Sequence, residues 1–183
     1  MRLFVRLSLV GLIVLVAIGF ANNFLATYGE SKSDATYNSE VTLNQGGCSG
    51  DGVHVVIDFG SKANAGVVNK CVGEFKGTSW DLLTAATLEV TGTQKYPVGF
   101  VCRINGFPAE EDEPCLDTPK PSVGSWAYFV AQPSSDSWQY STWGAATHKA
   151  LCGSAEAWLF KYQDENLETP PSIKPETSVC SSN

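Results

Sequence analysis

Alternating apolar and polar positions predict a series of short β-strands separated by turns. The first covers residues 53–59, a run rich in β-branched residues that ends at Gly60. Period-two spacing divides this run into one face of Val53, Val55, Ile57 and Phe59 and another of His54, Val56 and Asp58. Residues 66–72 form the expected partner strand.

One segment, residues 78–88, has helical rather than period-two spacing. Thr78 is a suitable N-cap, and Asp81 follows three residues later, close to the pattern of a capping box. The apolar side chains on the expected inner face are Trp80, Leu82, Leu83 and Ala86. A short strand or turn is expected next, at residues 89–93.

The stretch 96–115 predicts a strand, a tight turn and an acidic loop. Phe100, Cys102 and Ile104 share one strand face, and Asn105-Gly106 is the residue pair that tolerates positive φ in a type I′ turn. An acidic, proline-bounded segment follows and ends at Cys115. Pairing of Cys102 with Cys115 would fasten this loop back onto the strand.

The second half of the chain predicts three more strands. They cover residues 125–131, 138–140 and 156–162, and the Gly- and Ala-rich residues 143–152 are expected to form a loop. Strands, one helix and then more strands indicate an α+β fold. We expect a mixed or antiparallel sheet with one main helix across one face, braced by disulfides.

The two ends of the chain have different compositions from this domain. Residues 1–21 carry Arg2 and Arg6 before an apolar run, which is typical of a secretory signal cleaved after Ala21, with an uncleaved anchor as the alternative. Residues 22–50 predict a flexible polar spacer, and residues 51–163 the folded domain. Residues 164–183 are rich in Pro, Ser and Glu and predict a disordered tail, except where Cys180 holds it.

Charge and cysteine content narrow the class of protein. Without Arg2 and Arg6, 10 Lys and Arg remain against 19 acidic residues, a net charge of −9 that argues against nucleic acid and anionic membranes. An even number of cysteines behind a signal segment indicates disulfides. Six cysteines allow 15 pairings, of which proximity favours Cys48–Cys71, Cys102–Cys115 and Cys152–Cys180.

Two groups of side chains are candidates for contact with other molecules. The aromatic group suits a planar ligand or a protein partner, with burial in the core as the alternative; it comprises Trp126, Tyr128, Trp138, Tyr140 and Trp143. The acidic group comprises Glu110, Glu111, Asp112 and Glu113. Four adjacent acids lack the alternating spacing of a calcium loop, so we expect a solvated loop.

No combination of residues predicts an enzyme. The chain lacks a phosphate-binding glycine loop, a zinc-protease helix motif, a nucleophile elbow and a Cys-x-x-Cys pair. His148 has no evident partner and is expected to be solvated. Because the cysteines lack zinc-like spacing and His54 and His148 stand alone, no metal site is expected.

The ordered set of landmarks resembles the transcobalamin-like C-terminal domain family, in particular its short secreted actinobacterial members. The segments that carry the resemblance are Leu82-Leu83, the Phe100–Gly106 stretch, the aromatic strand 126–130, the 138–140 hairpin and Gly153–Trp158. They extend over about residues 53–162. The resemblance implies a β-grasp-like domain with a ligand-facing role. In the family's cobalamin carriers this domain closes over one face of the corrinoid, beside a helical barrel that is absent from this sequence, and many bacterial members have no known ligand.

These observations lead to two functional hypotheses. The first is a secreted or cell-surface, non-enzymatic binding module for cobalamin or another flat metabolite, without a firmly expected cofactor. The alternative is a protein-interaction module that docks through the acidic disulfide loop, residues 107–115. In either case the membrane is expected to be contacted only by an uncleaved N-terminal segment.

Overall fold

The computed structural model describes residues 43–46, 48, 50–120 and 122–181, which belong to the unit 39–183. The expected signal segment, and the spacer up to residue 42, lie outside the described residues. Among the residues described, no helix has the length and apolar character needed to cross a membrane.

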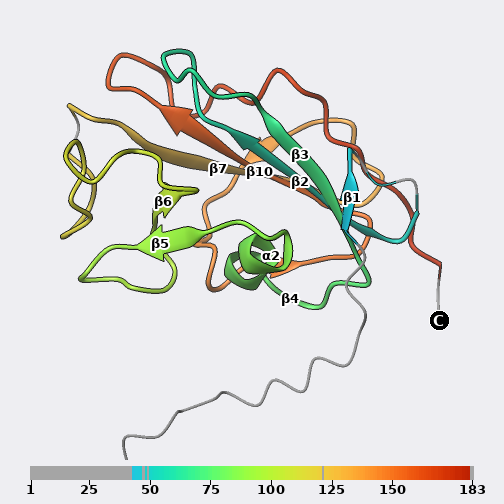
Figure 1. Cartoon of the computed structure of the whole chain (residues 1–183). Helices are drawn as coiled ribbons and strands as arrows, with labels where there is room; N and C mark the ends of the chain where they lie inside the picture. Colours follow the sequence, from blue (N-terminus) through green and yellow to red (C-terminus); the bar gives the residue numbers. More distant parts are fainter. Residues whose placement is uncertain (1–42, 47, 49, 121, 182–183) are drawn as a thin grey trace, which may run out of the picture. The chain divides into compact units, whose positions relative to one another are not determined.

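A six-stranded mixed sheet forms the centre of this unit (Figure 1). Its strands lie in the order β1 (Leu43–Gln45), β3 (Val68–Gly73), β2 (Gly52–Asp58), β10 (Ala155–Lys161), β7 (Ser125–Ala131) and β8 (Gln139–Tyr140). The central strands β2 and β10 are parallel, and every other neighbouring pair is antiparallel. The fold is therefore α+β with a mixed sheet, as the sequence predicts.

The start of helix α2 (Ser79–Ala85) is fixed by its N-terminal capping residues. The Thr78 hydroxyl accepts a hydrogen bond from the Asp81 backbone N–H, and the Asp81 carboxylate accepts from the Thr78 N–H at 3.1 Å, which completes the expected capping box. The helix ends earlier than its apolar spacing predicts, because Thr87 has a φ of 56°, in the left-handed region.

Two pairs of short strands accompany the helix. β4 (Gly77–Thr78) pairs with β9 (Lys149–Ala150), and β5 (Val90–Gly92) pairs with β6 (Val101–Ile104). The segment 143–152, expected as a loop, therefore contributes the two residues of β9. At the end of β6, Asn105 and Gly106 have φ values of 49° and 77°, as a type I′ turn requires.

Both faces of the sheet are buried. On one face, Val53, Val55 and Ile57 pack with Leu82 and Leu83 of α2; we call this the helix-side core. On the other face lies a smaller tail-side core of Val56, Ala127, Phe129, Ala157 and Leu159, against which Trp138 and Ile173 pack. The alternation in residues 53–59 thus marks two different apolar layers rather than an inner and a solvated face.

The C-terminal segment covers the second face, and the prediction of a disordered tail is wrong for residues 164–181. The carbonyl of Ile173 accepts a hydrogen bond from the Trp138 indole at 2.7 Å, and the Glu176 N–H donates to Nδ1 of buried His54 at 2.9 Å. Thr177 donates to the carbonyl of Ser135 at 2.7 Å. The composition of this segment does not predict these contacts, because each is made by a single residue in an otherwise polar stretch.

Three disulfides brace the unit: Cys48–Cys71, Cys102–Cys115 and Cys152–Cys180. These are the pairs that sequence proximity favours. The first fixes the approach to β2 against β3, the second closes the acidic loop, and the third holds the tail. Disulfides persist in oxidising compartments, so they suggest an extracellular environment.

Removing the third disulfide should destabilise the domain. It closes a loop with a sequence separation of 28, so loss of both sulfurs in Cys152→Ser/Cys180→Ser should lower the free energy of unfolding by about 3 kcal/mol. Urea denaturation of the oxidised proteins measures this difference. Val179→Ser, at a neighbouring side chain that is 80% exposed, should stay within about 0.5 kcal/mol of wild type. Equal loss in both variants would contradict the assigned role of the tail.

Candidate functional site

Aromatic side chains surround a hollow of about 150 Å³ on the helix side of the sheet, which we call the aromatic hollow. Its lining comes from the segment leading into β6, from β7, β8 and β10, and from the loop after β8. The lining residues are Gly99, Phe100, Val101, Trp126, Tyr128, Tyr140, Ser141, Trp143, Gly144, Ala145 and Trp158. Segments far apart in the sequence thus bring six aromatic residues together.

Four of the five aromatic residues singled out from the sequence line this hollow: Trp126, Tyr128, Tyr140 and Trp143. Trp138 does not line it, because its ring packs on the tail-side core. The sequence reasoning missed Phe100 as a lining residue. Its interpretation of Trp158 as a core residue is confirmed, since Trp158 is 1% exposed in the helix-side core, but Trp158 also lines the hollow. Trp158 joins the hollow because β10 pairs with β7 and places it opposite Tyr128, a pairing that no local pattern encodes.

Exposure increases from the floor of the aromatic hollow to its rim. Trp158 is 1% exposed and Tyr128 9%, whereas Tyr140 is 40% and Trp143 67% exposed. The Trp126 indole donates to the Cys102 carbonyl at 3.2 Å, and the Ser141 hydroxyl donates to the Trp143 carbonyl at 3.1 Å. The floor is therefore fixed, and the exposed Trp143 ring at the rim is accessible to a bound molecule. The Tyr140 ring instead packs edge-on against Phe129 of the tail-side core, with the ring centroids 5.6 Å apart.

A buried hydrogen-bonded triangle lies behind Tyr128. The Tyr128 hydroxyl is 2.9 Å from Glu156 Oε2 and 2.7 Å from Ser79 Oγ, and Ser79 donates to Glu156 Oε1 at 3.0 Å. Ser79 and Glu156 are fully buried. The triangle joins the first residue of α2 to β7 and β10, so it fixes the helix and the floor of the aromatic hollow together.

His148 also borders this triangle, so the expectation of a solvated, unpartnered histidine is wrong. Its Nε2 lies 3.8 Å from Glu156 Oε1, its side chain is only 17% exposed, and its ring contacts Tyr128 edge-on. Burial lowers the pKa of His148, which favours the neutral imidazole. Its backbone carbonyl accepts a hydrogen bond from the Ser79 N–H at 3.0 Å.

Burial raises the pKa of Glu156 to about 7, although hydrogen bonds from Ser79 and Tyr128 oppose this change. The pKa of Tyr128 is raised too, by burial and then by the Glu156 charge. With the proton on Glu156, the three groups can donate in a circle: Glu156 to Tyr128, Tyr128 to Ser79, and Ser79 to Glu156. The geometry therefore accommodates a neutral carboxylic acid as well as a carboxylate.

The acidic loop does not expose all four of its carboxylates. Glu110, Glu111 and Asp112 are exposed, but Glu113 is 3% exposed. Its carboxylate accepts hydrogen bonds from the backbone N–H groups of Cys115 and Lys120, both at 3.0 Å. The expectation of a solvated interaction residue is thus wrong for Glu113, which shapes the loop instead.

Arg103 holds the same loop from the strand side. Its guanidinium donates to the backbone carbonyls of Pro108 and Glu113, each at 2.6 Å. Together with the Cys102–Cys115 disulfide, these bonds give the loop a fixed shape. The three exposed acids are therefore presented on a rigid support.

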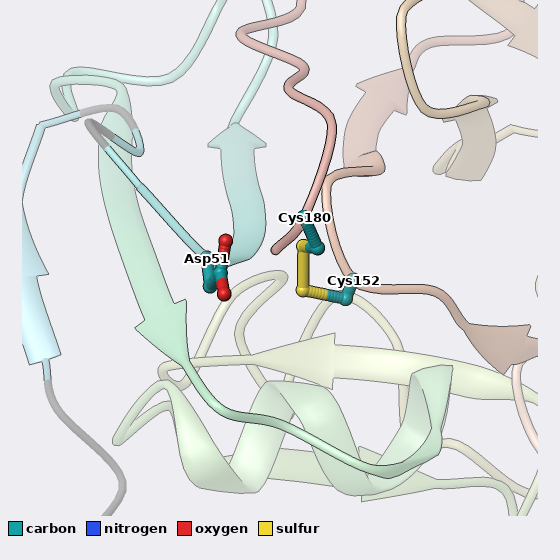
Figure 2. A group of neighbouring side chains, drawn as sticks. All are labelled: Asp51, Cys152 and Cys180. Carbon is teal, nitrogen blue, oxygen red and sulfur yellow. A yellow bond between two sulfur atoms is a disulfide. The ribbon is translucent and has the colours of Figure 1, made fainter. Parts of the chain in front are cut away.

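One group of potential metal ligands does not form a metal site. Figure 2 shows Asp51 beside Cys152 and Cys180, whose sulfur atoms are bonded to each other and therefore cannot act as thiolate ligands. Asp51 accepts a hydrogen bond from the Ser181 N–H at 2.9 Å. Both ring nitrogens of His54 are also hydrogen-bonded and so are not open to a metal ion. Nε2 pairs with Asn69 Oδ1 at 2.6 Å, and Nδ1 accepts from the Glu176 N–H.

No protein-family model, curated protein or solved structure matches the chain. The resemblance to the transcobalamin-like C-terminal domain family therefore stays a prediction from the sequence motifs. The geometry of the aromatic hollow and of the acidic loop is the basis on which function is inferred.

Glu156→Gln should change how stability depends on pH. A carboxyl group whose pKa rises from 4.5 to about 7 on folding stabilises the native state below pH 4.5 and loses this contribution as pH rises through 7. Glutamine keeps the triangle but does not ionise. From about pH 4 to about pH 8, the free energy of unfolding of the variant relative to wild type should therefore increase by on the order of 3 kcal/mol.

Chemical denaturation across this pH range measures the difference. Burial lowers the pKa values of His54 and His148, so both histidines destabilise the native state as pH falls. The effect of His54 cancels between the two proteins, whereas His148 lies 3.8 Å from Glu156, so the comparison measures Glu156 together with its coupling to His148. Glu168→Gln, at an exposed position, is the matched control. A constant difference between Glu156→Gln and wild type at every pH would refute a raised carboxyl pKa.

Proposed function

We propose that this chain is a secreted or cell-surface, non-enzymatic binding module whose contact site is the aromatic hollow. The observation that carries the proposal is the gathering of six aromatic residues around one depression, with the Trp143 ring left exposed at its rim. Exposed rings beside an apolar depression are characteristic of binding surfaces, because each ring buries a large area and retains a polar atom.

The size of the aromatic hollow limits how a ligand binds. At about 150 Å³ it is smaller than the roughly 300–1,000 Å³ of sites that enclose a whole drug-sized molecule. A corrinoid or another flat metabolite would insert one ring or side group and lie with its remaining surface against Trp143. Such partial enclosure predicts modest affinity.

The sheet topology supports the β-grasp-like class implied by the family resemblance. The two central strands, β2 and β10, are parallel and come from opposite ends of the domain. Each has an antiparallel neighbour on its outer side, and α2 packs across one face. We propose on these grounds that the chain is a transcobalamin-like domain that uses its helix side for contact.

Binding of cobalamin or a flat substitute should depend on Trp143. Replacing this exposed ring in Trp143→Ala should weaken binding at least tenfold without unfolding the protein, because the side chain is 67% exposed. Isothermal titration calorimetry with cobalamin, a flavin and a porphyrin measures this loss. Trp138→Phe, a change on the opposite face, should bind like wild type. Absence of binding to all three compounds would rule out a planar ligand.

The rigid acidic loop supports a second function, docking of a basic protein. Its exposed acids Glu110, Glu111 and Asp112 are held by a disulfide and by Arg103, so little conformational entropy is lost when a partner binds. This contact would weaken with salt.

The triple change of Glu110, Glu111 and Asp112 to serine should abolish salt-sensitive capture of a basic partner from the cell surface. Glu113 is left intact, because it shapes the loop. A triple serine change at the exposed residues Asp164, Glu168 and Glu176 keeps the net charge matched. Equal capture by both variants, measured by pull-down at two salt concentrations, would count against the loop.

A further inference from the structure

The lining of the aromatic hollow combines many rings with an absence of formal charge. Besides the six aromatic residues, it consists of glycine, valine, serine and alanine. No lysine, arginine or histidine side chain is among the lining residues, and the chain as a whole carries a net charge of −7. A phosphate or carboxylate group would find no cationic partner there, so anionic ligands are disfavoured.

The rings themselves favour positive charge. The face of an aromatic ring carries partial negative charge, and organic cations bind within cages of tryptophan and tyrosine rings for this reason. Three of the lining residues are tryptophans, the ring that binds cations best. Behind the floor, the Tyr128 hydroxyl contacts the Glu156 carboxyl at 2.9 Å, which places a further acidic group one ring away from the hollow.

We infer, on the basis of the proposed binding function, that the group held in the aromatic hollow is a compact organic cation, namely a methylated ammonium group. A metabolite that carries such a group would place it against the exposed Trp143 ring, above the buried Tyr128 and Trp158 rings of the floor, which are stacked on each other. The rest of the molecule would extend from the rim into solvent. The inference thereby specifies the group held in the aromatic hollow, a quaternary ammonium, whether or not the rest of the ligand is flat.

The size of the hollow agrees with this occupant. A closed apolar cavity of about 150 Å³ accommodates one benzene molecule, and a trimethylammonium group has comparable bulk. The hollow has the same volume, about 150 Å³, but is open at the rim. It can therefore hold the methylated head group while a longer substituent extends into solvent.

Among the residues that the structure describes, the lysines that lie over aromatic rings are Lys62 over Tyr162 and Lys95 over Tyr96, and neither ring lines the aromatic hollow. The groups that contact Glu156 are Ser79, Tyr128 and His148, and burial lowers the pKa of His148, which favours the neutral imidazole.

The test compares choline with 3,3-dimethylbutan-1-ol, which has the same shape but a neutral carbon in place of the nitrogen. Calorimetric titration of the full chain should give at least about tenfold tighter binding of choline. Trp143→Leu preserves an apolar rim without a ring, so it should remove this preference. Tyr162→Leu, which changes an aromatic residue of a separate surface depression, should retain it.

The outcomes separate this inference from the proposed function. Equal binding of the two compounds would overturn the preference for a cation and leave the aromatic hollow as a binding site. Binding of cobalamin, a flavin or a porphyrin with no binding of choline would also overturn the inference alone. If no compound binds, both the inference and the proposed function fail.

Discussion

A single buried triangle of hydrogen bonds connects the parts of this domain that form its candidate site. Glu156 on β10 contacts Ser79 at the start of α2 at 3.0 Å and Tyr128 on β7 at 2.9 Å. A buried carboxyl without such partners would be strongly destabilising. Because the same tyrosine forms part of the floor of the aromatic hollow, the attachment of the helix and the shape of the site depend on one interaction.

The sheet gains a second buried face from the C-terminal segment rather than from another helix. Ile173 and Trp138 cover the tail-side core, while His54 and the Cys152–Cys180 disulfide hold the segment in place. This arrangement leaves the helix side free of the tail at the rim of the hollow. A small domain thereby buries both faces of its sheet and still exposes Tyr140 and Trp143.

The sequence predicted those features that depend on local spacing. Period-two alternation located β2, β7 and β10, and Thr78 with Asp81 located the start of the helix, because strand faces and caps are set by residues close in the chain. It could not predict which strands are neighbours, so it did not place Trp158 beside the hollow, and it grouped Trp138 with the wrong face. Glu113 resembled its exposed neighbours in composition, yet backbone N–H groups from later in the loop hold it inside.

Tryptophan indole signals in a nitrogen–proton NMR spectrum test the central claim, ligand contact at the aromatic hollow, most directly. Titration with choline, and separately with cobalamin, should shift the Trp143 signal and, to a smaller extent, those of Trp126 and Trp158. The Trp138 signal should stay fixed, since its N–H is bonded to Ile173 on the opposite face. If neither compound moves the Trp143 signal, or if Trp138 alone responds, the aromatic hollow is not the site of contact.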